Sequence, residues 1–374
     1  MYNPTEIVNF ELLSSYLRTS SVSLDKFVNG SILIIDIRSK EGLISIKKNE
    51  KPDFIIERFY IPKKNKKLGY RIVYKLKNQF TIDILKVLKF NLDDLYIPAD
   101  CVHGFVKNRN TLTNAKCHIN KKYLLKLDIK NFFESINIES IKKAFMSLGF
   151  TEEIANNLSK ICTLQGKLVQ GYPTSPILAN IVCSNLDKEL SYYCNQVKAT
   201  YTRYADDISI TSDLEYPQIE IIVDILKKYG FKLNKLKSQK FKFGQNQYVT
   251  GLSIADEKYP RIPKSVKKRL RQQLHYLKLY GYHSHICYIN NWDEKTDISV
   301  TSELSSKLRN YIKGWIDYIN PIEPKVAKQL YDEFNIIDNI EKEKSMKNHE
   351  KLKQESGGII TLRIEDKYPI LKNK

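Results

Sequence analysis

The segment TYTRYADDISIT (Thr200–Thr211) places two aspartates, Asp206 and Asp207, side by side among apolar, β-branched and aromatic residues. Adjacent carboxylates repel each other, and strand interiors disfavour aspartate. Because turns tolerate aspartate and leave its carboxylate free, the pattern predicts a strand–turn–strand unit with both acids at its tip. A divalent cation between the acids would relieve their repulsion, and Mg²⁺ prefers such hard oxygen ligands.

A third carboxylate, Asp128, ends the short apolar segment LLKLD, which is typical of a buried strand. An aspartate at that position is costly unless it is paired or bound to a metal. Three acids on two adjacent strands can hold two metal ions ~3.5–4 Å apart, an arrangement that serves in-line phosphoryl transfer. The structural alternative is a hairpin turn with two solvated aspartates and a separate aspartate that caps a helix.

The charge of the chain favours a polyanionic partner. Its 374 residues include 61 Lys and Arg against 42 Asp and Glu, a formal charge of +19. Such an excess is typical of proteins that bind nucleic acid, and a solvated lysine-rich surface is the structural alternative. We expect no membrane segment, because no apolar run approaches ~18 residues and the N-terminus lacks a signal peptide.

The six cysteines contain no CxxC pair, so we interpret them as reduced and mostly buried thiols of a cytoplasmic protein. For the same reason we expect no zinc site. The HSH segment at His283–His285 is interpreted as part of a loop.

Apolar spacing predicts a mixture of helices and strands. Strand patterns occur in residues 31–37 and 123–129, and on both sides of a basic turn in residues 60–76. We also predict a hairpin in residues 241–254 with its turn at Gly244–Asn246. Helical spacing occurs over residues 81–92, 151–164, 173–190, 217–231, 265–281 and 302–319.

Five motifs occur in order within residues 58–255 and resemble those of reverse transcriptases. They are YIPKKNKKLGYRIVYKL, LKLDIKNFFESI, QGYPTSPILANIV, YADD and GFKLNKLKSQKF. Two further segments narrow the resemblance: TNAKCH (Thr113–His118) matches the NAxxH signature of retron reverse transcriptases, and YVTGLSI matches their VTG segment. Retron enzymes are related to the reverse transcriptases of group II introns.

The resemblance implies an α+β fold of the right-hand polymerase type. We expect fingers and a palm, in which an antiparallel sheet packs on helices, followed by a helical thumb. The expected domains are an N-terminal extension, fingers and palm, thumb, and a partly flexible C-terminal extension, at residues 1–55, 56–258, 259–322 and 323–374. The C-terminal extension includes a strand-like stretch at 358–364.

The resemblance also assigns roles at the acids. Asp128, Asp206 and Asp207 are implied to bind two Mg²⁺ ions, with the backbone carbonyl of Ile129 as a further ligand. Phe133 matches the steric gate, a bulky ring under the sugar that excludes ribonucleotides by overlap with the 2′-hydroxyl. The alternative for Phe133 is a place in the core.

Further residues match contacts to the incoming nucleotide. Lys64 and Arg71 match the basic pair that grips the triphosphate, with Lys63 as an alternative to Lys64 and a solvated basic hairpin as the structural alternative. The other matching positions are Asn131, Phe132, Phe133, Gln170 and Gly171.

A last group is expected to lie near RNA. Asn114 and His118 of the NAxxH signature are implied to help hold the cognate RNA, although a satisfied structural histidine is the alternative. Lys237 matches the lysine of the GFxxNxxK motif and is implied to support the palm or the primer strand. The basic residues expected to follow phosphates, with a solvated helix face as the alternative, are Lys264, Lys267, Lys268, Arg269 and Arg271.

The function implied is that of an RNA-directed DNA polymerase of a retron. Such an enzyme uses dNTPs to copy part of its cognate structured non-coding RNA into branched, RNA-linked msDNA, and retron systems commonly pair it with an effector protein in antiphage defence. The alternatives are a group II intron enzyme, a diversity-generating reverse transcriptase and a polymerase-fold RNA-binding scaffold. The SP ending of QGYPTSP disfavours the diversity-generating type, and all three acids disfavour the scaffold.

Overall fold

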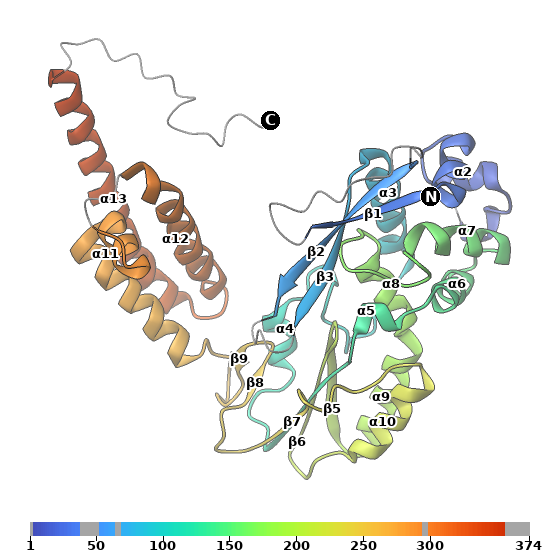
Figure 1. Ribbon diagram of the computed structural model, residues 1–374. Helices are drawn as coiled ribbons and strands as arrows, with labels where there is room; N and C mark the ends of the chain where they lie inside the picture. The colour runs from blue at the N-terminus through green and yellow to red at the C-terminus, as the bar shows by residue number, and fades with distance from the viewer. Residues whose placement is uncertain (1–2, 38–51, 64–68, 294–297, 356–374) are drawn as a thin grey trace. The chain divides into compact units, whose positions relative to one another are not determined.

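The computed structural model describes residues 3–37, 52–63, 69–293 and 298–355. The chain divides into two compact units, Met1–Pro260 and Arg261–Lys374 (Figure 1). Both units are described separately below. Lys64 and the strand-like stretch at 358–364 lie outside the described residues.

The first unit is built around a four-stranded antiparallel sheet with the strand order β5-β6-β4-β7. Alternating apolar residues along these strands bury one or both faces, as the sequence pattern predicts. The strands are β4 (Tyr123–Asp128), β5 (Ala199–Tyr204), β6 (Asp207–Ser212) and β7 (Gln239–Lys242). The strand predicted at 123–129 is confirmed.

Two smaller sheets complete the strands of the first unit. In one, β1 runs parallel to β2, and β2 pairs antiparallel with β3. The other is a two-stranded hairpin of β8 and β9. These strands are β1 (Ile32–Ile37), β2 (Phe54–Pro62), β3 (Tyr70–Leu76), β8 (Tyr248–Val249) and β9 (Leu252–Ser253).

Helices cover the sheets and form the main core with them. Helix α9 packs on β5 and α10 packs on α9, so both lie along one side of the four-stranded sheet (Figure 1). The helices are η1 (Pro4–Glu6), α1 (Phe10–Tyr16), α2 (Ser21–Asn29), α3 (Gln79–Leu95), α4 (Thr111–Lys116), α5 (Phe132–Ser135), α6 (Ile138–Ser147), α7 (Glu152–Cys162), α8 (Ser175–Val182), α9 (Ser184–Gln196) and α10 (Ile219–Lys228).

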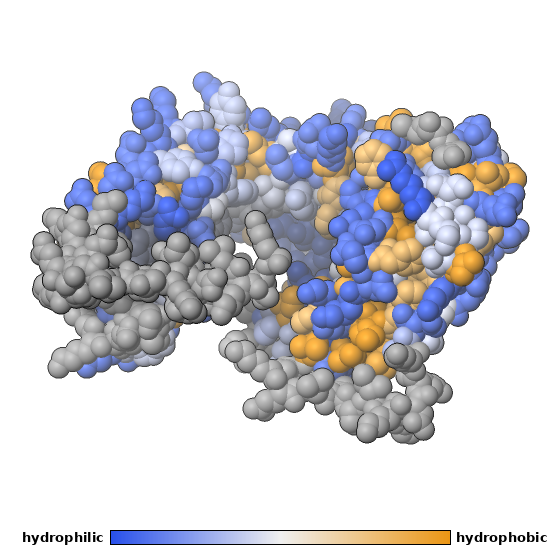
Figure 2. Space-filling model, turned by 90° about the horizontal axis from the view of Figure 1, so that it is seen from above, coloured by the Kyte–Doolittle hydropathy of each residue, from blue (hydrophilic) through white to orange (hydrophobic). Residues whose placement is uncertain are grey.

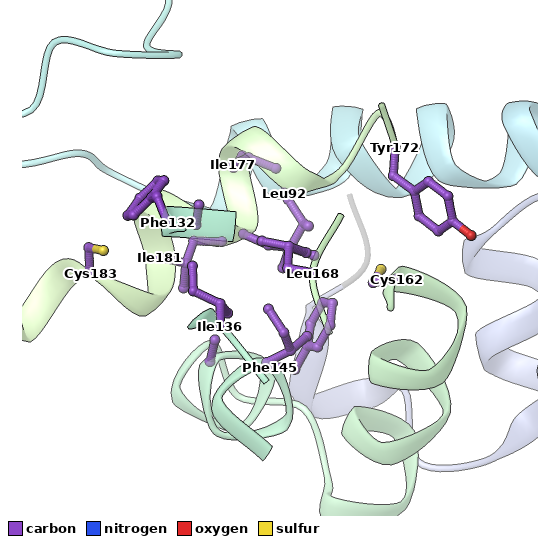
Figure 3. Packing of buried hydrophobic residues seen from close by; sticks show 14 of the residues in the cluster. Leu92, Phe132, Ile136, Phe145, Cys162, Leu168, Tyr172, Ile177, Ile181 and Cys183 are labelled. Carbon is purple, nitrogen blue, oxygen red and sulfur yellow. The ribbon is translucent and has the colours of Figure 1, made fainter. Parts of the chain in front are cut away.

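The core shows why these segments are helical. Leu92 of α3, Phe145 of α6 and Ile177 of α8 are buried and converge from different helices (Figure 3). Helix α7 begins at its N-cap Thr151, whose side chain accepts the N–H of Ile154, as the sequence predicts. Burial of these apolar faces, at roughly 25 cal/mol per Å² of apolar surface, is the main stabilising term for the unit.

Two predictions of local structure are wrong. The helix predicted over 173–190 is divided at Cys183, which ends α8 and precedes α9. The hairpin predicted with its turn at Gly244–Asn246 instead turns at Thr250 and Gly251, both with positive φ, while β7 pairs with β4. Glycine at either place is compatible with a turn, so local chemistry did not decide between the two registers.

The second unit consists of three helices, α11 (Lys264–Asn290), α12 (Ile298–Ile319) and α13 (Pro324–Glu355). Apolar side chains such as Leu270, Leu274 and Ile316 are buried in it. Helix α11 is kinked at Gly281, where φ is 76°. The HSH segment follows that kink inside α11, so its interpretation as a loop is wrong.

Hydrophilic residues cover much of the described surface seen in Figure 2. None of the described helices combines the length and the apolar character needed to cross a membrane.

A close backbone crossing joins β3 to the segment that precedes α8. The N–H of Tyr74 donates a 2.8 Å hydrogen bond to the carbonyl of Gln170. Gly171 follows with φ of 113°, and a Cβ atom placed on it would lie 1.9 Å from the carbonyl oxygen of Tyr74. Only glycine fits this crossing, because both the backbone angle and the space exclude a side chain.

We therefore expect Gly171→Ala to lower the free energy of unfolding by about 2–5 kcal/mol, because it adds overlap to backbone strain. Gly230→Ala is the matched control: Gly230 also has a positive φ, 82°, but nothing lies within 4 Å of its added Cβ. The control should cost only about 1 kcal/mol in strain. Chemical denaturation of both variants measures the difference, and equal losses would contradict the crowding at Tyr74.

Candidate active site

The turn between β5 and β6 presents the paired aspartates. It holds Ala205 and Asp206, while Asp207 is the first residue of β6 and pairs with Tyr204. Ala205 has a φ of 58°, a left-handed conformation that is uncommon for residues other than glycine but suits the first position of a tight hairpin turn. The predicted strand–turn–strand unit with the acids at its tip is confirmed.

The third carboxylate lies on the neighbouring strand. Asp128 ends β4 and is the register partner of Asp207. The N–H of Ile129 donates a 2.9 Å hydrogen bond to the carbonyl of Asp206, which ties the turn to the end of β4. The structure thus brings together at one sheet edge three residues that we call the acid cluster: Asp128, Asp206 and Asp207.

The acid cluster is a concentration of negative charge that the protein neutralises only in part. Partial burial raises the pKa of Asp206, and the nearby charge of Asp128 raises it further. The loss of water around its carboxylate, and then the charge of Asp206, raise the pKa of Asp207 to about 6, although its side chain keeps contact with solvent. Such raised values are expected where like charges share a site and lack a counterion.

Two polar side chains of the loop after α10 donate hydrogen bonds to the carboxylate of Asp128. The Nδ2 of Asn234 donates to its Oδ1 at 2.9 Å, and the Nζ of Lys237 donates to its Oδ2 at 2.7 Å. Lys237 has a raised pKa: burial lowers it, but the hydrogen bond and charge of Asp128 raise it more. Asp128, Asp207 and Lys237 also line a depression of about 290 Å³. The structure thus places Lys237 at the carboxylate of Asp128.

The donor set of the acid cluster fits a divalent cation in its chemistry. Carboxylate oxygens are the ligands that Mg²⁺ prefers, and the acid cluster supplies them from three side chains at the ends of neighbouring strands. Within the described residues, no three His, Cys, Asp or Glu side chains are already arranged as a metal site. Both carboxylate oxygens of Asp128 accept hydrogen bonds from Asn234 and Lys237.

Several of the residues predicted to contact the incoming nucleotide lie on or beside β3. Arg71, an exposed residue of β3, is close enough to lower the pKa of Asp206 by its charge. Gln170 and Gly171 contact the same strand at Tyr74. Lys63, the alternative to Lys64, is exposed, and its N–H donates to the carbonyl of Gly69.

Three residues after Asp128 divide between surface and core. Asn131 is exposed with φ of 50° and precedes α5. Phe132 is buried and stacks on Phe231, with ring centroids 5.9 Å apart. Phe133 is only partly buried, with its ring centroid 6.2 Å from that of Phe105. Phe132 thus fills the core, which leaves Phe133 available at its edge.

The structure does not support the predicted RNA contact of Asn114 and His118. His118 is completely buried, and its ring nitrogens form hydrogen bonds of 2.8 and 2.7 Å with Thr211 and Thr202. Burial lowers the pKa of His118 to about 3, so the ring is neutral. Asn114 is also buried, at 1% exposure. Both side chains lie inside the protein, and the structural alternative for His118 fits.

In the second unit, one of the five predicted basic residues has another role. Lys267 forms an ion pair with the buried Glu323 at 2.9 Å, so it is not available to a phosphate in this conformation. Glu323 also accepts the N–H of Ile262. The remaining four are exposed: Lys264, Lys268, Arg269 and Arg271.

Sequence reasoning missed two residues that hold the turn of the acid cluster. Arg203 is completely buried, and its guanidinium forms an ion pair with Asp187 at 2.6 Å. Gly104 packs against the turn, since a Cβ atom on it would lie 2.3 Å from the amide nitrogen of Ala205. A single charged residue in the strand ATYTRY was the available signal, because a buried charge requires a partner.

Comparison with known proteins identifies related sequences. A family profile described as "Reverse transcriptase (RNA-dependent DNA polymerase)" matches residues 61–279, more than half of the chain. Retron Ec86 reverse transcriptase of Escherichia coli is 29% identical over 279 residues, which cover 74% of this chain and 84% of that protein. Retron Ec73 reverse transcriptase of the same species is 27% identical over 300 residues, with shares of 74% and 87%.

Retron Mx65 reverse transcriptase of Myxococcus xanthus is 29% identical over 294 residues, which cover 73% of this chain and 62% of that protein. The relatives and the family profile agree with the family that the motifs resemble. The chain therefore belongs to the family of reverse transcriptases, the RNA-dependent DNA polymerases, and its similarity there is to retron-type members.

Proposed function

We propose that this RNA-directed DNA polymerase copies part of a cognate structured non-coding RNA into branched, RNA-linked msDNA by two-metal phosphoryl transfer. The observation that carries the proposal is the acid cluster, in which Asp128 and Asp207 are register partners and Asp206 adjoins them. Two Mg²⁺ ions bound there supply charge to activate the primer hydroxyl and to neutralise the leaving pyrophosphate.

The residues around the acid cluster support the same reaction. Asp128, Asp206 and Asp207, with the carbonyl of Ile129, would hold the ions. Arg71 places positive charge near Asp206 and suits a contact with the triphosphate. Lys237 provides a positive charge at Asp128. Movement of the Lys237 side chain away from Asp128 would free a carboxylate oxygen of Asp128 as a ligand. The ammonium group of Lys237 would then be available to another anion in the site.

The polymerase parts are proposed as follows. Fingers and palm occupy residues 56–258 and the thumb residues 259–322, flanked by the extensions at 1–55 and 323–374. The thumb would follow the phosphates of the template–primer duplex, and the candidates for these contacts are Lys264, Lys268, Arg269 and Arg271. We further propose a cytoplasmic antiphage role with an effector protein as partner.

The first test replaces both acids of the turn. Asp206→Asn with Asp207→Asn should abolish Mg²⁺-dependent DNA synthesis, a loss of at least about 1,000-fold, because the neutral amides do not neutralise metal charge. RNA binding should persist. Asp213→Asn is the control, since Asp213 follows the other end of β6, where it is exposed and pairs with Lys121.

Nucleic acid purified with the proteins gives the second readout of that experiment. The polymerase expressed together with its own genomic flanks should carry DNA joined to RNA by a 2′–5′ bond, and the double variant should carry RNA alone. Undiminished DNA synthesis by the double variant would rule out the metal assignment. DNA without a branch would contradict the synthesis of msDNA and would indicate a reverse transcriptase of another type.

The charge of Asp207 should be visible in stability. The folded-state pKa of Asp207, about 6, lies above its ordinary value of 3.8. The folded protein therefore binds the proton more tightly, and the free energy of unfolding falls as the pH rises between these values. Asp207→Asn removes this loss, so at pH 7 the variant should be more stable, by about 1 kcal/mol after discounting for solvent screening.

Asp213→Asn should show the opposite sign, because its hydrogen bond with Lys121 lowers the pKa of Asp213. Urea denaturation between pH 4 and pH 7, without divalent metal, measures both effects. If the free energy of unfolding changed with pH by the same amount in the wild type and in Asp207→Asn, the unfavourable charge at Asp207 would be contradicted.

The sugar selectivity tests Phe133. Phe133→Ala should admit ribonucleotides, with discrimination against rNTPs falling by about 10-fold to 100-fold, because removal of the ring opens space for the 2′-hydroxyl. Phe133→Tyr keeps the bulk and should keep the discrimination. The ratio of kcat/KM for dNTP and rNTP measures the change, and an unaltered ratio in Phe133→Ala would remove this residue from the gate.

A further inference from the structure

A fully buried guanidinium lies directly behind the turn of the acid cluster. Arg203 is 0% exposed and has one of the largest completely buried side chains among the described residues. Its Nε and Nη2 donate to the two carboxylate oxygens of Asp187 at 2.8 and 2.6 Å. Its Nη1 donates to the Oδ1 of Asn180 at 3.1 Å and to the carbonyl of Ala205 at 3.2 Å.

This ion pair is a poor device for stability alone. Removal of two charges from water costs several kcal/mol per ion, and well-packed apolar residues of similar volume often stabilise a protein equally well or better. The pair does, however, fix directions. A guanidinium donates along set lines in one plane, so four bonds to Asp187, Asn180 and Ala205 define one position for the turn.

The turn needs such support because its backbone is unfavourable. Ala205 adopts φ of 58° without being glycine, a conformation that costs of order 1 kcal/mol or more and persists only when neighbours hold it. Arg203 holds the carbonyl of Ala205, and the N–H of Ile129 holds the carbonyl of Asp206. Gly104 closes the remaining side, against the amide of Ala205.

The backbone of Arg203 extends the same support. Its N–H donates to the carbonyl of Cys101 at 2.8 Å, and its carbonyl accepts the N–H of His103 at 2.9 Å. Asn180, which receives Nη1, donates in turn to the carbonyl of Gly104 at 2.9 Å. Helix α8, the segment 101–105 and the turn are therefore joined through a single side chain and its backbone.

We propose that Arg203, anchored by Asp187, is a positioning residue that sets where the β5–β6 turn presents Asp206 and Asp207 to the metal ions. The inference rests on the proposed two-metal function and adds a residue that touches neither metal nor substrate. Arg203 acts through the carbonyl of Ala205, one residue before the first metal-binding acid.

The primary test is Arg203→Lys. Lysine keeps the charge but donates from one atom, so it cannot reach both Asp187 and the carbonyl of Ala205 in the plane that arginine uses. We expect kcat for DNA synthesis on an RNA template with an annealed DNA primer to fall by roughly 10–100-fold, as a displacement of about 1 Å would produce. The Mg²⁺ concentration for half-maximal rate should rise, with the KM for dNTP changing less.

A second variant protects the test against misfolding. Arg203→Met with Asp187→Asn removes both charges together, so neither is left buried without its partner, and the asparagine still accepts the hydroxyl of Tyr201. Gly104→Ala approaches the turn from the opposite side without altering the ion pair, since its Cβ would force the amide of Ala205 to shift. Both should raise the Mg²⁺ requirement in the same direction.

Arg58→Lys is the matched control, because Arg58 forms a partly buried pair with Asp36 between β2 and β1. It should leave the Mg²⁺ requirement unchanged. Loss of folded protein scales the rate but does not move the Mg²⁺ concentration for half-maximal rate, so that value separates positioning from stability; thermal unfolding reports the folded fraction.

The outcomes separate the two proposals. If the wild-type protein synthesises DNA with Mg²⁺ and the Arg203 variants raise the Mg²⁺ requirement, the positioning role is supported. If those variants, once folded, keep the wild-type Mg²⁺ requirement and kcat, the positioning role is overturned while the proposed function stands. If the wild-type protein shows no metal-dependent synthesis, the proposed function itself fails.

Discussion

The repulsion among three carboxylates at one sheet edge is the constraint on which the rest of this polymerase depends. Pairing of β4 with β6 makes Asp128 and Asp207 register partners, and the β5–β6 turn adds Asp206. Partial burial raises the pKa values of both turn acids, and the charge of a neighbouring acid raises them further. Lys237 and Arg71 offset it in part, and a cation of higher charge would do so more fully.

The sequence was sufficient to find this site because its signals are local. A strand that is apolar up to a terminal Asp128, and a turn that carries two acids, are each recognisable without knowledge of the partner strand. The mixture of helices and strands followed from the apolar spacing, and the α+β class that the resemblance implied agrees with the structure. Phe132, which stacks on Phe231, lies in the core, and Phe133 lies at its edge.

What the sequence could not reveal depends on contacts between distant segments. His118 was assigned to RNA, but its nitrogens meet Thr202 and Thr211, more than eighty residues away. Lys267 was grouped with exposed basic residues, although it forms an ion pair with Glu323 within the helical unit. Such partners are selected by the packing of helices and strands, and neither composition nor spacing encodes which charged residue finds one.

The crossing at Gly171 has a mechanical consequence. The amide of Tyr74 grips the carbonyl of Gln170, and the glycine leaves no room between the two chains. Strand β3 also carries Arg71. Because Tyr74 of the same strand is bonded to Gln170, a displacement of β2 and β3 would move Arg71 and the Gln170–Gly171 segment together. Under the proposed function both segments contact the incoming nucleotide, and the Tyr74–Gln170 bond would keep them in a fixed relation to each other.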